Sequence, residues 1–224
     1  MAVARCAILL AALMYSRMLS RITRSLAIAL MFAVISLTGN GWCQVLDHKV
    51  ALDTSGVWNP DAYRSLLIAM TVGQIGLAVW EGGETRLGNT AWRGIDSEII
   101  AAVSAQALKY ATTRVRPSNT DNPGLWFQGG SNYSFPSGEA AEAASIVTPY
   151  ILEYGQEHPA VYALTLVPLY VGVARVKAQA HWQTDVLAGW AVGGLAGWYA
   201  HERDSPLLLQ IMPHGIFVGL KKKF

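Results

Sequence analysis

Three short polar stretches interrupt an otherwise apolar sequence, and each holds residue types that bind or attack phosphate. In chain order they contain Lys109 and Arg116, then Ser137 and Gly138, then Arg175, His181 and Asp185. Arginine offers a planar fork of donors that matches a phosphate group, and lysine offers a compact charge. A serine and a glycine before a run of helix-forming residues suit an anion-binding helix N-terminus. Together these residue types predict chemistry on a phosphate group.

His181 and Asp185 are four residues apart, so on a helix they share one face. A carboxylate that accepts one ring N–H of a histidine fixes the tautomer and leaves the other nitrogen as a nucleophile. Each stretch alone also has a plainer explanation. Lys109 suits a helix C-terminus, Ser137 suits an ordinary N-cap, and a histidine–aspartate pair is often structural. The phosphate hypothesis therefore depends on the three stretches occurring together.

The composition indicates a membrane protein or an unusually apolar helical domain. Of the 224 residues 52% are hydrophobic and 14% are charged, whereas average globular chains carry about 25% charged residues. The mean hydropathy is +0.28. A net charge of +2 gives no argument for nucleic acid as a partner. Cys6 and Cys43 have no metal-binding or redox spacing.

Apolar periodicity predicts five helices beyond the N-terminal region: Leu66–Trp80, Ile99–Leu108, Ala140–Leu152, Val161–Arg175 and Val186–Ala200. Asp96 or Ser97 is expected to cap the second of them. No stretch alternates with the period of a strand, so the expected fold class is all-α. With an apolar N-terminal segment the chain would be a helical bundle of about six apolar helices, embedded in a membrane.

Two further patterns concern the first and the last segment. Arg17, Arg21 and Arg24 precede the apolar run 26–37, which is typical either of a secretory signal cut after Cys43 or of a first transmembrane segment. In the last helix, glycines at 189, 193 and 197 recur every fourth residue. They are expected to let a neighbouring helix of the same chain approach closely.

The order and spacing of the polar stretches resemble a known family. The blocks are Lys109, six residues, Arg116-Pro117; Pro136-Ser137-Gly138; and Arg175, five residues, His181, three residues, Asp185. This pattern resembles the type 2 phosphatidic acid phosphatase superfamily, which holds lipid phosphatases, bacterial acid phosphatases and vanadium haloperoxidases. It looks most like the membrane-embedded bacterial branch. The resemblance implies a phosphatase-like helical domain at 44–224, with its motif core at 60–200, after a signal peptide or first span at 1–43.

The resemblance also implies an activity. A lipid phosphate or diphosphate would be hydrolysed without a metal or other cofactor. His181 would attack phosphorus to form a phosphohistidine, and Asp185 would orient it. The phosphate would be bound by Lys109, Arg116, Arg175, Ser137 and Gly138. The positive-inside rule puts both chain ends in the cytoplasm, so the site would face the periplasm from a bacterial inner membrane. The expected partners are the lipid and the bilayer, and the sequence indicates no oligomeric state.

The sequence departs from the family pattern at two positions. Glu139 stands where the family has its general-acid histidine, and Ala174 stands where it has a serine. Three explanations of Glu139 remain open. In the first, Glu139 itself serves as the acid. In the second, the acid is water or another residue, with Glu142, His48 and His158 as candidates. In the third, a diphosphate leaving group needs no acid. Glu139 also suits pairing with a cation of the empty site.

The same departure leaves other functions open. One is a soluble periplasmic acid phosphatase released by signal cleavage. Another is a non-catalytic phosphate-binding membrane protein, and a third is a vanadate-dependent haloperoxidase. Substrate choice is expected in loops 39–62 and 117–133. Trp126 and Phe127 in the second loop are expected to anchor at the membrane interface or to cover the site.

Overall fold

The computed structural model describes residues 45–203, 209–212 and 215–218. Within these ranges five α-helices dominate: α3 (Pro60–Glu81), α4 (Arg86–Thr112), α5 (Gly138–Tyr154), α6 (Leu166–Lys177) and α7 (Gln183–His201). Three short 3-10 helices are η1 (Gly56–Trp58), η2 (Pro117–Asn119) and η3 (Pro159–Thr165). Strands β1 (Leu209–Met212) and β2 (Gly215–Val218) form an antiparallel hairpin with Leu209 opposite Val218.

The five helices expected after the N-terminal region are present, and four of them are longer than expected. The exception is α6, which begins at Leu166 and not at Val161, because residues 159–165 form the 3-10 helix η3. The remaining expected apolar helix falls within residues 1–43, outside the described residues. Helix α4 begins far earlier than expected, at Arg86, where the Thr85 hydroxyl accepts a hydrogen bond from the Gly88 amide at 2.9 Å. Asp96 and Ser97 are therefore not caps but buried residues in the middle of α4. The expectation of no strand is corrected by the hairpin β1–β2.

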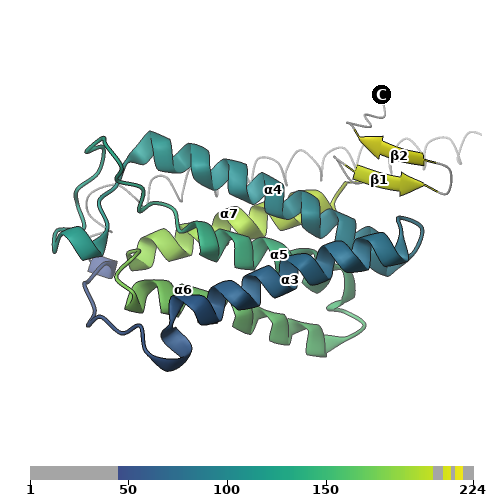
Figure 1. The fold of residues 1–224 in the computed structure, drawn as a ribbon, viewed down its shortest axis with the longest axis horizontal. Helices are drawn as coiled ribbons and strands as arrows, with labels where there is room; N and C mark the ends of the chain where they lie inside the picture. The colour runs from purple at the N-terminus through teal and green to yellow at the C-terminus, as the bar shows by residue number, and fades with distance from the viewer. Residues whose placement is uncertain (1–44, 204–208, 213–214, 219–224) are drawn as a thin grey trace, which may run out of the picture. The chain divides into compact units, whose positions relative to one another are not determined.

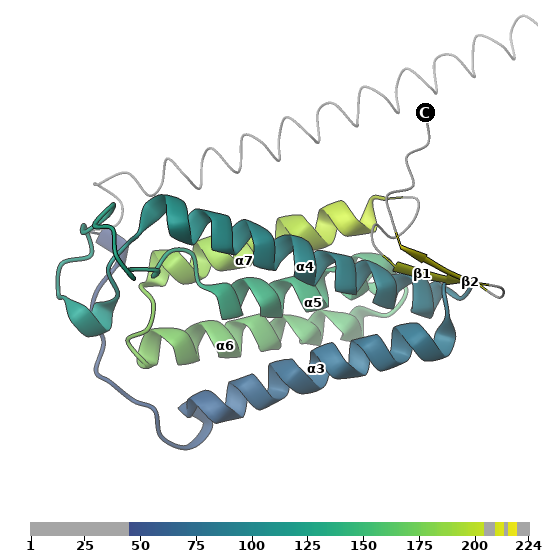
Figure 2. The same ribbon diagram turned by 45° about the horizontal axis from the view of Figure 1, so that its top comes forward.

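Helix α5 lies at the centre of the bundle and contacts each of the four other helices (Figures 1 and 2). Its closest neighbour is α7. A side chain at Gly189 would meet the Ser137 carbonyl, one at Gly193 the Ala141 carbonyl, and one at Gly197 the Thr148 side chain. The expected close approach within one chain is therefore confirmed. It brings the start of α5 directly against the first turns of α7.

The helix directions bring all three polar stretches to one end of the bundle. Helices α4 and α6 end there, and α5 and α7 begin there (Figure 2). The first stretch follows α4, the second opens α5, and the third joins α6 to α7. Tyr63, near the start of α3, also reaches this end, where its hydroxyl accepts a hydrogen bond from Arg175. Residues far apart in the sequence can thus share one site.

Parts of the helical surface are strongly apolar. In the described part of the chain two helical segments are long and apolar enough to cross a membrane: Pro60–Glu81, with a mean hydropathy of 1.4, and Pro159–Lys177, with 1.5. Ile68, Val72 and Trp80 on α3 project large exposed side chains. The core inside α3, α5 and α6 is packed by small and medium residues, among them the fully buried Ala174. The change from serine at this position is therefore absorbed by apolar packing.

Candidate active site

The His181 ring is buried, with 1% of its surface exposed, in the loop that leads into α7. Its Nδ1 lies 2.6 Å from the Ser134 carbonyl oxygen. A carbonyl can only accept, so Nδ1 carries the proton and donates it. Nε2 is buried and has no hydrogen-bond partner among the described residues. Burial lowers the pKa of His181 to about 4, against a raising effect of Glu139. Near neutral pH the ring is thus neutral, with a free electron pair on Nε2.

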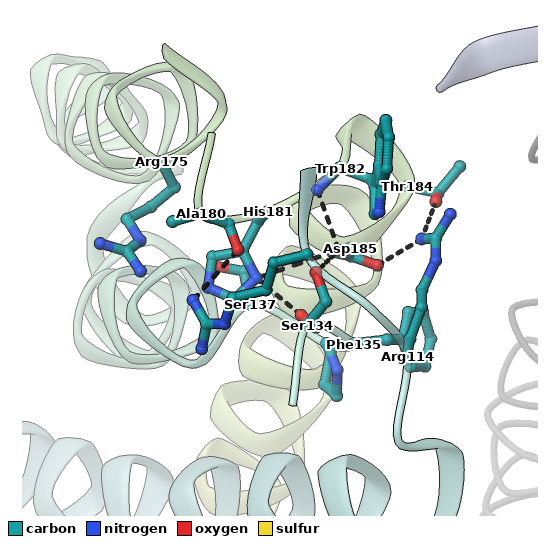
Figure 3. Close-up of polar contacts among 12 residues, drawn as sticks. Arg114, Ser134, Phe135, Ser137, Arg175, Ala180, His181, Trp182, Thr184 and Asp185 are labelled. Atoms are coloured by element: carbon teal, nitrogen blue, oxygen red, sulfur yellow. Dashed lines mark hydrogen bonds and ion pairs between the residues drawn. The ribbon is translucent and has the colours of Figure 1, made fainter. Parts of the chain in front are cut away.

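Asp185 does not contact the His181 ring directly, because its Oδ2 lies 3.9 Å from Nδ1. The i, i+4 argument fails because α7 begins only at Gln183, so His181 precedes the helix. The Asp185 Oδ2 accepts hydrogen bonds from the Ser134 hydroxyl at 2.6 Å and the Trp182 amide at 2.9 Å. Figure 3 shows Asp185 between His181 and Arg114. Asp185 therefore fixes Ser134, whose carbonyl in turn orients the ring.

Lys109 and Arg116 bring their charges together at one backbone oxygen. Lys109 Nζ donates to the carbonyls of Tyr133 at 3.1 Å and Pro136 at 2.6 Å. Arg116 donates to the Tyr133 carbonyl at 3.3 Å and to the Ala180 carbonyl, next to His181, at 3.1 Å. Burial and then the charge of Arg116 lower the pKa of Lys109 to about 8. Burial and then Arg175 lower the pKa of Arg116. Two crowded cations favour an anion as their neighbour.

Arg175 approaches the same place from the last turn of α6. Its Nη1 donates to the Tyr63 hydroxyl, and its Nη2 lies 3.2 Å from Glu139 Oε1. Its Nε is buried without a hydrogen-bond partner in the described part of the chain. Arg175 is 6% exposed. Figure 3 shows its side chain extending from α6 on the side of His181 away from Asp185.

Glu139 stands between Arg175 and His181. Its Oε2 lies 3.7 Å from His181 Nε2, and its other oxygen meets Arg175. Burial raises the pKa of Glu139, but the contact with His181 and the charge of Arg175 lower it further, so the net direction is downward. Glu139 is therefore an ionised carboxylate at a position where an anionic group contacts both His181 and a cation.

Ser137 and Gly138 form the start of α5. The Ser137 hydroxyl caps the helix by accepting from the Ala140 amide at 3.4 Å, and its amide donates to the Asp185 carbonyl at 2.9 Å. The plain capping role of Ser137 is thus present. A side chain at Gly138 would lie 3.6 Å from the Lys109 side chain. Lys109, Gly138 and Glu139 also line a groove of about 470 Å³ that continues between α4 and α5.

The three alternative candidates for the proton donor are His158, His48 and Glu142. His158 follows the far end of the 17-residue helix α5, about 25 Å along the axis at 1.5 Å per residue. His48 is exposed, and its ring nitrogen lies 3.3 Å from the Leu46 carbonyl. Neither histidine contacts His181 or Glu139. Of these three candidates only Glu142 lines the same groove as Glu139, and Glu98 lines it as well.

The sequence reasoning missed Arg114, which is fully buried behind Asp185. Its Nη1 donates to Asp185 Oδ1 at 2.5 Å. Trp126 is also buried, with the Arg114 guanidinium 4.2 Å from its ring centroid. Trp126 therefore neither anchors at a membrane interface nor covers the site, whereas Phe127 is 73% exposed. The sequence offered no signal for the contact between Arg114 and Asp185, because an extended segment places residues two apart, such as Arg114 and Arg116, on the same side.

A family model described as the PAP2 superfamily matches residues 95–205, which include every polar stretch of the site. The chain belongs to the PAP2 superfamily. This match confirms the resemblance drawn from the spacing of Lys109, Arg116, Ser137, Arg175 and His181. The PAP2 motif core is therefore the part of the chain in which the site geometry is built.

Several characterised PAP2-related proteins are similar to the chain. A lipid A 1-phosphatase of Porphyromonas gingivalis is 38% identical over 93 residues, which are 41% of this chain and 18% of that protein. An undecaprenyl-diphosphatase of Sulfolobus acidocaldarius is 30% identical over 111 residues, 49% of this chain and 52% of that protein. A lipid A 1-phosphatase of Rhizobium etli is 30% identical over 101 residues, 43% and 42% of the two chains. The chain thus spans about half or less of the length of these relatives.

Two solved structures are also similar. LpxE of Aquifex aeolicus has 21% identity and a TM-score of 0.42, with 69% of this chain and all of that chain covered. A transmembrane PAP2 type phosphatidylglycerolphosphate phosphatase from Bacillus subtilis has 19% identity and a TM-score of 0.45, with 80% and 84% covered.

Proposed function

We propose that this PAP2 protein is a phosphatase that hydrolyses a lipid phosphate or diphosphate through a phosphohistidine at His181. One observation carries the proposal. The Nε2 atom of a neutral, oriented histidine is buried without a hydrogen-bond partner in the described residues, beside the cation Arg175. An unpaired buried nitrogen is costly, and a group of this kind next to a cation suits attack on an anionic centre.

The charges supply the electrostatic part of the reaction. Lys109, Arg116 and Arg175 would neutralise the phosphate oxygens, and the first amides of α5 would add donors at a helix N-terminus. Phosphoryl transfer depends mainly on positioning and charge stabilisation. In this proposal the three side-chain cations supply that stabilisation, so the reaction requires no metal.

The bonds change in two steps. The electron pair of Nε2 forms an N–P bond while the bond from phosphorus to the leaving oxygen breaks and its electrons depart with that oxygen. In both steps the Ser134 carbonyl oxygen accepts a hydrogen bond from Nδ1–H, and it stabilises the imidazolium that results. Water then attacks phosphorus and gives one proton to solvent. The N–P bond breaks, its electron pair returns to Nε2, and inorganic phosphate is released.

Glu139 influences which leaving group suits the site. The empty site favours the carboxylate form, because the contacts with His181 and Arg175 outweigh the effect of burial on its pKa. An ionised Glu139 is a counter-ion for Arg175 and has no proton to donate. We infer that Glu139 gives way when a phosphate binds, and that a lipid diphosphate, from which the lipid monophosphate leaves as a stabilised anion, is the better substrate.

The substrate is assigned to the lipid class on two grounds. Relatives of the chain are named lipid A 1-phosphatase and undecaprenyl-diphosphatase. The protein also exposes apolar residues along two segments that are long enough to cross a membrane. We place it in the bacterial inner membrane with the site facing the periplasm. A soluble periplasmic phosphatase is the alternative, and extraction of membranes with alkaline carbonate separates the two.

The test is release of inorganic phosphate by the full chain purified in detergent, with EDTA present. The substrates are undecaprenyl diphosphate, phosphatidate, lipid A and p-nitrophenyl phosphate, and His181→Ala is the control. We expect metal-independent release that is fastest from the diphosphate and is lost in the variant. Release that persists in His181→Ala would overturn the proposed nucleophile. No release from any substrate, with phosphate binding retained, would favour a binding protein instead.

A further inference from the structure

Residues 47–53, ahead of η1, lie across the loops that carry the site. We call them the N-terminal segment. The Gln183 side chain exchanges hydrogen bonds with the backbone of His48, at 3.1 and 2.9 Å. The Gln179 side chain donates to the Val50 carbonyl at 2.7 Å, and the Asp53 amide donates to the Lys177 carbonyl at 3.0 Å. The whole connection between α6 and α7 is therefore tied to this segment.

Asp47 is the buried end of the segment. Its Oδ1 accepts from the Thr184 amide at 2.8 Å. Its Oδ2 accepts from the Thr184 hydroxyl at 2.7 Å and from Arg114 Nη2 at 2.6 Å. The side chains of Asp47 and Arg114 are both 0% exposed. Because the Asp47 side chain is shielded from solvent and each of its oxygens has a hydrogen-bond donor, its orientation is fixed.

Arg114 connects Asp47 to Asp185 by hydrogen bonds. Its guanidinium lies between two carboxylates, with Nη2 on Asp47 and Nη1 on Asp185 at 2.5 Å (Figure 3 shows the second pair). The faces of Trp126 and Trp182 pack on it, at 4.2 and 5.6 Å from their ring centroids. One continuous set of hydrogen bonds then runs from Asp47 through Arg114, Asp185 and Ser134 to His181 Nδ1.

The connection between α6 and α7 requires such support. Gln179 has a φ of 52°, in the left-handed region that side-chain-bearing residues seldom adopt. Residues 178–182, which include His181, form a turn outside both helices, and only the Ala178 amide still makes an α-helical hydrogen bond, to the Ala174 carbonyl at 2.9 Å. Contacts from outside the loop must hold such a conformation. Asp47 supplies the most deeply buried of these contacts.

We propose that Asp47 is a positioning residue of the phosphatase site, acting through Arg114 and Thr184 on the loop that carries His181. This inference rests on the proposed function for its effect on turnover. Without the Asp47 charge, Arg114 would have Asp185 as its only carboxylate, and a buried ion network with one member removed rearranges or takes up water. The Ser134 carbonyl and the His181 ring would then lose their fixed direction.

Two of the three cations of the phosphate site, Lys109 and Arg175, stand outside this network, and Arg116 meets the loop only at the Ala180 carbonyl. Lys109 is held by the carbonyls of Tyr133 and Pro136, and Arg175 by Tyr63 and Glu139. A change at Asp47 should therefore lower kcat and leave phosphate affinity nearly unchanged. A merely structural role would lower the amount of folded protein, and would not separate kcat from KM.

The experiment compares Asp47→Asn with Lys49→Ala in the full chain. Asparagine keeps an oxygen for the Thr184 amide and removes the charge. Lys49 lies in the same segment and makes only an exposed ion pair with Asp121, so Lys49→Ala is the matched control. We expect Asp47→Asn to lower kcat about 10- to 100-fold, with KM and the inhibition constant of inorganic phosphate within about twofold of the wild type. Unchanged kcat, or an equal loss in Lys49→Ala, would overturn the proposal.

Two further measurements test the role of Asp47 if Asp47→Asn does not fold or if the wild type releases no phosphate. If Asp47→Asn does not fold, Thr184→Val removes one hydroxyl contact of Asp47 at nearly the same volume, and a smaller loss confined to kcat is expected. Hydrogen exchange of the peptide 179–185 should also be faster in Asp47→Asn than in Lys49→Ala. If the wild type releases no phosphate, the proposed function fails, while exchange still decides the inference: equal exchange in the two variants overturns it.

Discussion

The two sides of the His181 loop differ in how fully their polar atoms are satisfied. Behind the loop, Asp185 accepts from Arg114, Ser134 and the Trp182 amide, and every oxygen of Asp47 has a donor. In front of it, His181 Nε2 and Arg175 Nε are buried without hydrogen-bond partners among the described residues. Buried polar atoms are rarely left unpaired. The side behind the loop, where the polar atoms are paired, thus positions the His181 ring. The side in front, where they are unpaired, is where a substrate would bind.

The largest expected effect on the front side is the loss of Arg175. Arg175→Ala should lower kcat/KM about 10²- to 10³-fold, because one of three transition-state cations is removed. Arg64→Ala is the matched control, since Arg64 is exposed and its guanidinium lies 5.9 Å from the centroid of the same Tyr63 ring. Steady-state phosphate release measures both variants. A loss no larger than that of Arg64→Ala would mean that Arg175 serves only to pair with Glu139.

The pH dependence of kcat/KM tests two groups of the front side, His181 and Lys109, whose pKa values are both lowered. His181 attacks as the neutral ring, so the rate should rise with pH through about 4. Lys109 binds phosphate as the cation, so the rate should fall as pH rises through about 8. Each limb should change the rate about tenfold per pH unit.

Lys109→Arg sharpens this test, because arginine stays charged throughout the range. The alkaline limb should move upward by more than one pH unit in this variant, while the acid limb stays in place. An alkaline limb that does not move would assign it to another group and contradict the role of Lys109.

The smallest expected effect belongs to Glu139. Glu139→Gln should strengthen inhibition by inorganic phosphate about tenfold, equivalent to about 1.4 kcal/mol, since a competing carboxylate is removed from Arg175. The kcat with a diphosphate substrate should stay within about threefold. If kcat instead falls 10²-fold or more with phosphate affinity unchanged, Glu139 is a general acid, and the account of the front side is wrong on that point.

The sequence predicted the helices and the front of the site better than the back. Apolar periodicity locates all five helices of the described residues, and motif spacing identifies Lys109, Arg116, Arg175 and His181. The first half of α4 was missed because its polar, glycine-containing start lacks that periodicity. Gly88 is required there by the close approach of the Gly82 carbonyl.

The back of the site depends on contacts that no local pattern encodes. Asp47 meets Thr184 across 137 positions of the chain, and the sequence around Asp47 has no motif. The spacing of His181 and Asp185 predicts that they share one face of a helix. The chain instead starts α7 two residues after His181, so a backbone carbonyl of Ser134 took the place of the carboxylate. Every residue has a backbone carbonyl, so the residue types in the sequence do not reveal which carbonyl accepts the hydrogen bond from His181.

The most direct test of the central claim is to trap phosphate on His181. The protein is mixed with undecaprenyl diphosphate labelled with ³²P at the terminal phosphate, denatured in alkali within the first turnover, and digested for mass spectrometry. We predict label on the peptide that contains His181, none in His181→Ala, and retention of trapping with reduced turnover in Asp47→Asn. Phosphate release by the wild type without any label on His181 at any time point would contradict the account.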